Sequence, residues 1–299
     1  MAWHWIVQNW LRSVAEERIR EAVAEAARQQ MASAAAPPDI AAKAVCDVGA
    51  VFALSEESGG LEDLLAEVAT IKGNGFAIRV GLWKGRRVAV AIAGSGGSSA
   101  ARAAEALIAG HRPRLVFSAG FCGGLNDSVK RGDLVVAERI VRPGGEELPV
   151  DLDPIRSAPL FSRPGVHVGR IVTTDAIVRR PREKRALGEE FDALAVDLES
   201  AAVAGVCARR NVRFLAVRVV SDAVDDRLPR EVERLSRQKS PAARLGAALG
   251  AILDRPGAAK ELYRLKQNAL AASDRLAKGL ASLIVFLVPA PRDEAAKEP

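Results

Sequence analysis

Cysteine and histidine are scarce in this chain, which has three of each among its 299 residues. Cys46, Cys122 and Cys207 form no CxxC pair and leave one cysteine unmatched, so we expect no disulfide framework and a reducing compartment. The histidines stand far apart in the sequence and give no zinc-ligand spacing. The sequence therefore predicts no metal site.

Aromatic side chains make up only 4% of the sequence, and three of the four tryptophans lie within the first ten residues. A protein that stacks nucleic-acid bases would spread such side chains over a platform. The formal net charge of +6 does not indicate nucleic acid either, because residues 46–226 hold equal numbers of basic and acidic side chains. We therefore expect no nucleic-acid partner.

Long hydrophobic runs are also missing. The longest late apolar run, Gly279–Val288, has about half the length that a membrane span needs. The first residues lack the basic, apolar and small-residue order of a signal peptide, since Gln8, Asn9 and Arg12 interrupt the apolar positions. These features predict a cytoplasmic protein.

The sequence does contain a regular alternation of apolar runs and helix-like stretches. Several of the runs are rich in β-branched residues, which is typical of buried strands. The predicted strands are Val48–Leu54, Phe76–Leu82, Val88–Ala93, Leu115–Ala119, Leu134–Val141, Val166–Thr173, Leu194–Leu198 and Phe214–Val220. Helices are predicted at Ser98–Gly110, Arg182–Glu190 and Ser200–Arg210. The alternation predicts an α/β layered domain over residues 45–254.

Helical spacing of apolar residues also occurs near both ends of the chain. We expect an amphipathic helix with its linker over residues 1–36, and a second helix from 258 to about 288 followed by a charged tail to 299. Both helices are expected to pack on the domain or on a second subunit. The alternative is contact with an anionic membrane surface, since the basic excess lies in residues 227–299.

Three carboxylates follow predicted strands: Glu57, Glu199 and Asp222. Each of them alone is typical of a helix N-cap or of an acid near a helix start. A charged group at the end of an apolar strand is nevertheless partly desolvated, which is costly unless the charge is used. Since α/β sheets open their ligand crevices at strand ends, we expect these side chains to share a site.

Two glycine-rich turns follow strands as well. Gly94–Ser99 opens a predicted helix, and Gly120–Gly124 comes after another strand. Such turns offer backbone N–H groups to an anion or a sugar hydroxyl. Neither turn matches GxGxxG or GxxxxGK[ST], so no dinucleotide or nucleoside triphosphate site is predicted, and we expect no cofactor.

Five segments resemble, in order, the motifs of the purine nucleoside phosphorylase and nucleosidase superfamily. They are Ala53-Leu-Ser-Glu-Glu57, Ser118-Ala-Gly-Phe-Cys-Gly-Gly-Leu125, Arg131-Gly-Asp-Leu-Val-Val136, Val196-Asp-Leu-Glu-Ser-Ala-Ala-Val203 and Val217-Arg-Val-Val-Ser-Asp222. The resemblance covers about residues 46–250 and is greatest to the 5′-methylthioadenosine/S-adenosylhomocysteine nucleosidases. It implies a three-layer α/β/α fold with a mixed central sheet, a homodimer, and cleavage of the N-ribosidic bond of a purine nucleoside.

The resemblance also implies roles for the polar residues. Asp222 would protonate N7 of the leaving purine, with Ser221 beside it, and Glu199 would accept hydrogen bonds from the 2′- and 3′-hydroxyls of the ribose. Glu57 would activate the attacking water, and Arg218 would help to hold that water. A positively charged ribose and a negatively charged base develop during this cleavage, which is the chemistry that such groups serve.

Other positions are implied to contact the substrate. Leu54 and Leu198 would line the ribose and the 5′ substituent, and the backbone at Ile177 and Val178 would read the purine edge. Relatives usually have Ser-Gly-x-Gly where residues 94–97 read Gly-Ser-Gly-Gly, and Ser95 would supply the hydroxyl near the water.

The nucleophile is expected to be water rather than phosphate. A phosphate dianion needs arginine side chains beside a turn, but Gly94–Ser99 carries no basic residue and Ala53–Glu57 presents acids. The alternatives are a hopanoid-associated phosphorylase, whose adenosyl lipid would suit the apolar C-terminal helix, and a futalosine hydrolase. A domain that binds a nucleoside without cleaving it is a further alternative, although all three carboxylates are present.

Overall fold

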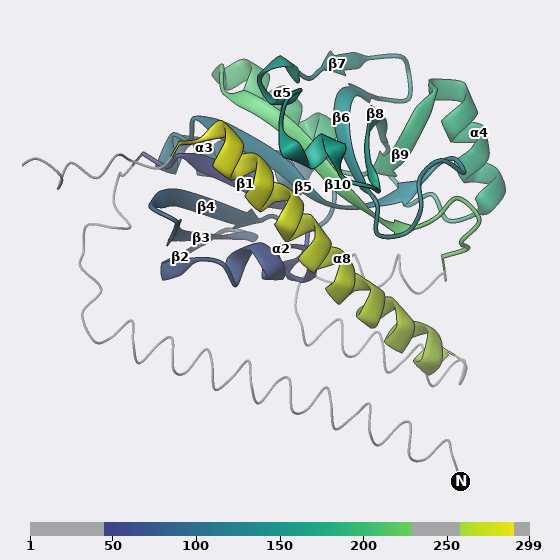
Figure 1. The fold of residues 1–299 in the computed structure, drawn as a ribbon, viewed down its shortest axis with the longest axis horizontal. Helices are drawn as coiled ribbons and strands as arrows, with labels where there is room; N and C mark the ends of the chain where they lie inside the picture. Colours follow the sequence, from purple (N-terminus) through teal and green to yellow (C-terminus); the bar gives the residue numbers. More distant parts are fainter. Residues whose placement is uncertain (1–44, 229–257, 290–299) are drawn as a thin grey trace, which may run out of the picture.

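The computed structural model describes residues 45–228 and 258–289 (Figure 1). Several expected segments therefore lie outside the described residues. These are the N-terminal helix and linker over residues 1–36, the part of the predicted domain from 229 to 254, and most of the charged tail.

Within the described residues, ten strands form one mixed sheet. The strands are β1 (Val48–Phe52), β2 (Ala66–Gly73), β3 (Phe76–Trp83), β4 (Arg86–Ile92), β5 (Leu115–Gly124), β6 (Leu134–Val141), β7 (Glu147–Pro149), β8 (Val166–Thr173), β9 (Ala193–Asp197) and β10 (Arg213–Asp222). Their order is β10-β6-β8-β9-β5-β1-β4-β3-β2, with β7 paired to β6. Because β10 also pairs with β5, the strands β5, β10, β6, β8 and β9 close into a ring.

Strand direction brings several strand ends to one place. β1, β4, β5 and β10 are parallel, so their carboxyl ends lie at the same edge. β9 runs antiparallel to β5 and crosses its end, where Val196 pairs with Gly123. The segments that follow β1, β9 and β10 therefore meet around the last residues of β5.

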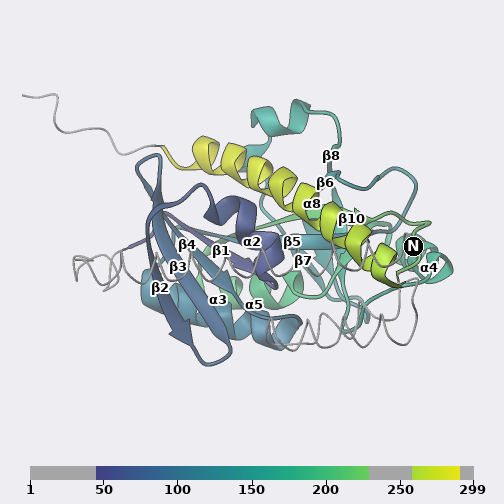
Figure 2. The ribbon, with the colours of Figure 1, turned by 90° about the horizontal axis from the view of Figure 1, so that it is seen from below.

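Helices cover both faces of the sheet. Figure 2 shows α2 (Ser55–Glu62) and α8 (Ala258–Leu287) on one side of the strands, with α3 (Gly97–His111) and α5 (Ser200–Arg210) on the other. A fifth helix of the described residues, α4 (Pro181–Phe191), packs beside β9, and two short 3₁₀ turns lie at Asp153–Ile155 and Pro159–Ser162. On the first face, Leu276, Leu280 and Leu283 of α8 join Phe52 in the core. The expected three-layer fold with a mixed sheet is confirmed.

The observed elements follow the predicted ones with four differences. The sequence did not predict β2, whose residues are mostly exposed, the short β7, or α2, which contains two glycines. The prediction that Gly120–Gly124 forms a turn was wrong, because these residues continue β5 and pair with β10. Their backbone must lie close to buried side chains, and glycine permits that approach.

Two further sequence predictions concern the whole chain. The three cysteines all lie within the described residues, where they are buried and form no disulfide. Among the described helices, none combines the length and the apolar character needed to cross a bilayer.

Candidate active site

Glu57 is held by backbone N–H groups at the start of α2. Its Oε2 accepts hydrogen bonds from the N–H groups of Ala53 at 3.0 Å and Leu54 at 2.9 Å. Its Oε1 accepts a bond from the N–H of Phe121 in β5 at 2.8 Å. Burial raises the pKa of Glu57, and these three N–H groups together with the charge of Arg218 oppose that rise. The carboxylate is therefore fixed in orientation at the end of β1.

Gly120 lets Glu57 and Arg218 approach the same point of β5. A Cβ atom at this position would lie 2.5 Å from Nη1 of Arg218 and 2.8 Å from Oε1 of Glu57. Both distances are shorter than carbon tolerates. This glycine segment therefore brings a carboxylate and a guanidinium together, and its expected binding of a ligand through N–H groups stays a prediction.

Arg218 is the central cation of the site. It projects from β10 and is 1% exposed. Its Nη2 lies 2.6 Å from Oδ2 of Asp197 and donates to the hydroxyls of Ser118 at 2.8 Å and Ser200 at 3.0 Å. Sequence reasoning assigned no role to Asp197, Ser118 or Ser200, although all three lie inside the quoted motifs. A buried arginine needs acceptors for its N–H groups. Polar residues next to the predicted site residues in the same motifs could therefore have been predicted as partners of Arg218.

Glu199 lies between the first glycine-rich turn and Arg218. Its Oε1 accepts a hydrogen bond from the N–H of Gly96 at 2.9 Å, and its Oε2 is 3.8 Å from Nη1 of Arg218. Burial raises the pKa of Glu199 to about 7, the charges of Asp197 and Glu57 add to that rise, and Arg218 opposes it. The turn thus binds a carboxylate of its own chain, and this carboxylate changes charge near neutral pH.

Asp222 is the last residue of β10 and faces Gly123 of β5. Its Oδ1 accepts a hydrogen bond from the hydroxyl of Ser221 at 2.6 Å. Its Oδ2 lies 2.5 Å from the ammonium nitrogen of Lys184, a residue of α4 that sequence reasoning missed. Burial raises the pKa of Asp222, and the charge of Lys184 opposes that rise.

The three predicted carboxylates therefore line one short segment of β5. Glu57 contacts Phe121, Arg218 connects Glu57 to Glu199, and Asp222 lies against Gly123 two residues further along. Glu57, Glu199 and Asp222 are 5%, 7% and 5% exposed, so each is almost fully withdrawn from water. Such an arrangement can bind hydroxyl groups, take a proton from water and deliver a proton to a second atom.

Two of the remaining predicted residues lie close to these carboxylates along the chain, one lies in a turn that contacts them, and two lie in a separate loop. Leu54 and Leu198 are half-buried beside Glu57 and Glu199, and Ser95 is half-buried in the turn that reaches Glu199. Ile177 and Val178 lie in the loop between β8 and α4, where Val178 also packs on a small core cluster. Their contacts with a substrate stay predictions.

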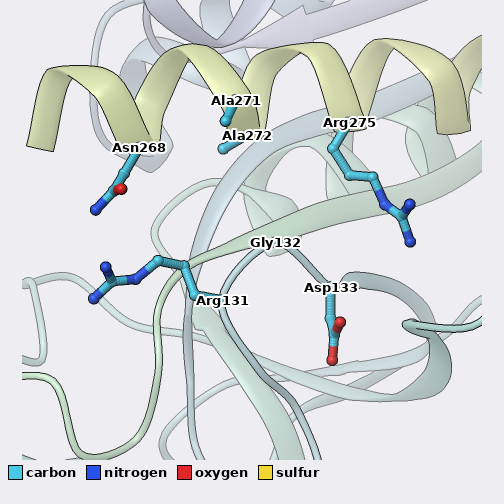
Figure 3. A pocket seen from close by; sticks show the side chains of 7 residues that line it. All are labelled: Arg131, Gly132, Asp133, Asn268, Ala271, Ala272 and Arg275. Atoms are coloured by element: carbon cyan, nitrogen blue, oxygen red, sulfur yellow. The ribbon is translucent and has the colours of Figure 1, made fainter. Parts of the chain in front are cut away.

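A cavity of about 420 Å³ lies on the α8 side of the sheet (Figure 3). In Figure 3, Asn268, Ala271, Ala272 and Arg275 of α8 face the turn formed by Arg131, Gly132 and Asp133. None of the three predicted carboxylates lines this cavity.

Comparison with known proteins identifies relatives of the chain. A 5′-methylthioadenosine/S-adenosylhomocysteine nucleosidase of Staphylococcus aureus strain MRSA252 is 25% identical over 197 residues, which are 58% of this chain and 86% of the relative. The fold is similar to that of the nucleosidase of the same name from Neisseria meningitidis, solved with methylthio-immucillin-A. That structure has a TM-score of 0.61 and 21% identity, covering 79% of this chain and 97% of the other.

The same fold occurs in the futalosine hydrolase of Helicobacter pylori, with a TM-score of 0.62 and 20% identity over 80% of this chain and 97% of that protein. At such identities these structures establish the fold alone. The relatives support the expected enzyme class, a nucleosidase that cleaves an N-glycosidic bond.

A sequence model of the phosphorylase superfamily matches residues 47–254, most of the domain predicted from the sequence. The chain is therefore a member of the phosphorylase superfamily.

Proposed function

We propose that this protein hydrolyses the N-ribosidic bond of an adenine nucleoside such as 5′-methylthioadenosine or S-adenosylhomocysteine. The observation that carries the proposal is the arrangement of Glu57, Glu199 and Asp222 around one glycine segment of β5, with Arg218 between the two glutamates. The names of the relatives support the substrate class.

Each carboxylate has a place in the proposed reaction. Asp222 donates a proton to N7 of the purine while the bond between C1′ and N9 breaks, and burial favours the protonated form that this requires. Glu199 accepts hydrogen bonds from the ribose hydroxyls. Glu57 takes a proton from the water that attacks C1′. The negative charges of both glutamates also stabilise the positive charge that develops on the ribose.

The choice of water over phosphate rests on the charges around the site. Arg218, the cation that bridges the glutamates, is already paired with Asp197 at 2.6 Å. The turn at Gly94–Ser99 directs the N–H of Gly96 to Glu199 instead of to an external anion. A phosphate dianion would therefore meet two carboxylates in place of an arginine fork.

The test is a product assay with purified protein. Methylthioadenosine, S-adenosylhomocysteine, futalosine, inosine and an adenosyl lipid would each be incubated with and without phosphate, and the released base and sugar would be identified. We expect free adenine and an unphosphorylated sugar. A sugar 1-phosphate that appears only with phosphate would instead identify a phosphorylase, and no base release from any of these compounds would contradict the proposal.

The first variant to test is Asp222→Asn. The amide oxygen can still accept the hydrogen bond from the buried Lys184, so the variant should fold with reduced stability. It should slow base release by about 10²–10⁴-fold, the usual effect of removing a general acid. Steady-state rates under saturating substrate measure this effect. An unchanged rate would remove Asp222 from the proposed mechanism.

The proposal also concerns association of the protein. Helix α8 exposes Leu270, Val285 and Phe286, which are suited to contact with a second subunit or with a membrane surface. A homodimer, peripheral membrane contact and a cytoplasmic location stay predictions.

A further inference from the structure

Lys184 is a buried cation for which the sequence motifs give no role. It lies on α4 and is 0% exposed, whereas lysine is rarely buried unless it is paired. Its ammonium group has three acceptors: Oδ2 of Asp222 at 2.5 Å, the carbonyl of Ala223 at 2.8 Å and the carbonyl of Asp226 at 3.0 Å. An ammonium group has three N–H bonds, so each one has an acceptor. This coordination fits the charged form of the side chain.

The contacts of Lys184 fix both the carboxylate and the turn behind it. The hydroxyl of Ser221 holds Oδ1 of Asp222, and Lys184 holds Oδ2. The turn from 222 to 226 is closed by Asp226, whose carboxylate accepts from the N–H of Ala223 at 2.6 Å and from Arg131 at 2.7 Å. Asp222 thus has its carboxyl plane set by two donors from two different elements.

We propose that Lys184 is a positioning residue for base protonation, which orients the carboxyl group of Asp222 and weakens its hold on the proton. This inference rests on the proposed function, in which Asp222 supplies the proton to N7. The ammonium favours the ionised carboxylate, so it makes the protonated acid a stronger donor. Other titratable groups also act on the pair. The charge of Asp226 raises the proton affinity of Asp222. The buried thiol of Cys122 in β5 is within electrostatic reach of both Asp222 and Lys184.

The effect on pH dependence has a definite sign. Burial raises the pKa of Asp222 and the charge of Lys184 lowers it, so Lys184→Met should raise it further. A general acid must be protonated, and its activity falls as the pH rises through its pKa. The alkaline limb of kcat/KM should therefore move to higher pH in Lys184→Met, by roughly 1–3 pH units for the loss of a contacting opposite charge. The plateau rate should fall, because the carboxyl group is less well oriented.

A matched control exists at the next position of the same helix. Arg185 also ties α4 to this turn, through Asp127 and Asp225, but its ion pairs are exposed to solvent. Arg185→Met removes the same charge and should leave the alkaline limb in place. A limb that does not move in Lys184→Met, or that moves equally in both variants, would overturn the inference.

The double variant Lys184→Met/Asp222→Asn separates this inference from the proposed function. If Lys184 acts through Asp222, its loss should change the rate of Asp222→Asn by less than about threefold, whereas independent effects would multiply. If the effects of the two substitutions on the rate multiply, the role of Lys184 is rejected and that of Asp222 is not affected. Full activity of Asp222→Asn would reject both roles. Should Lys184→Met fail to fold, the double variant, which buries no unpaired charge, still supplies this comparison with Asp222→Asn.

Discussion

Gly120 is a position where a single methyl group should disturb the site. In Gly120→Ala, the new Cβ would lie 2.5 Å from Arg218 and 2.8 Å from Glu57, and both of these groups are held by several hydrogen bonds. Since neither can move freely, we expect nucleoside cleavage to slow by on the order of 10–100-fold, as for other small misplacements of catalytic groups. Measurement of kcat/KM with the best substrate tests this.

Gly59 of α2 is the matched control for this substitution. A Cβ there would meet no atom within 4 Å, and alanine favours a helix over glycine by up to about 1 kcal/mol. Gly59→Ala should therefore keep the activity and raise the melting temperature slightly. Equal activities of the two variants would mean that the contact of Gly120 with the charged groups does not matter.

Among the individual residues of the site, the sequence predicts the acids better than it predicts the side chains that pair with them. Glu57, Glu199 and Asp222 stand at strand ends, where an unpaired charge is conspicuous. Lys184 stands in the segment Pro181-Arg-Glu-Lys-Arg185, which is typical of a solvated helix face. Nothing in that pattern indicates that one of these cations is turned inward, since its partner is 38 residues away.

Among the elements, α8 supports the helix that carries Glu57. The hydroxyl of Ser273 accepts a hydrogen bond from the N–H of Gly60 at 3.1 Å and donates one to the carbonyl of Glu57 at 3.2 Å. Ser273→Ala would leave both buried groups without this partner. We expect a loss of about 1–3 kcal/mol in the free energy of unfolding, measured by urea denaturation, together with lower activity because α2 is less well held.

The neighbouring exposed position of α8 supplies the comparison for that variant. Asp274→Ala changes an exposed side chain of the same helix, so the stability and activity of this variant should stay near those of the unchanged protein. If Ser273→Ala is as stable and as active as Asp274→Ala, α8 does not support the site.

Element boundaries also show why part of the fold escapes prediction. The glycines after Ala119 are typical of a turn, yet β10 on one side and β9 on the other keep them in β5. Among the described strands β2 pairs with β3 alone, and it exposes most of its residues, so it has no apolar alternation to detect. In both cases pairing with distant residues, which local sequence does not encode, decides the structure.

For the molecule as a whole, the superfamily match ends at residue 254, but the core continues into α8. Leu276, Leu280 and Leu283 are completely buried and pack on the same face of the sheet as α2. The sequence predicted this helix, with packing on the domain, packing on a second subunit and contact with a membrane surface as the alternatives. The helical periodicity of the apolar residues could not distinguish packing on the domain from contact with a membrane surface, because an apolar helix face can pack on either.

Three buried carboxyl groups with raised pKa values should make the stability of the whole molecule depend on pH. The pKa of Glu199 rises to about 7, and those of Glu57 and Asp222 rise as well, so the folded state binds their protons more tightly than the unfolded chain does. The contribution of Glu199 is therefore fully present below its ordinary pKa of about 4.5 and is lost as the pH rises through about 7. The contributions of Glu57 and Asp222 have the same sign and are also lost as the pH rises. For one group the free energy of unfolding should fall by at most about 1.4 kcal/mol per pH unit.

Glu199→Gln isolates one of these groups, because an amide keeps the shape of the protonated acid and does not ionise. This variant should melt at a higher temperature than the unchanged protein at pH 8 and at nearly the same temperature at pH 5. Glu190→Gln, which removes an exposed carboxylate from α4, should change the melting temperature little at either pH. The same difference between Glu199→Gln and the unchanged protein at both pH values would show that Glu199 is not protonated on folding. A stabilising effect confined to high pH, together with lost activity, would mean that the charge of Glu199 is retained for the reaction at the expense of stability.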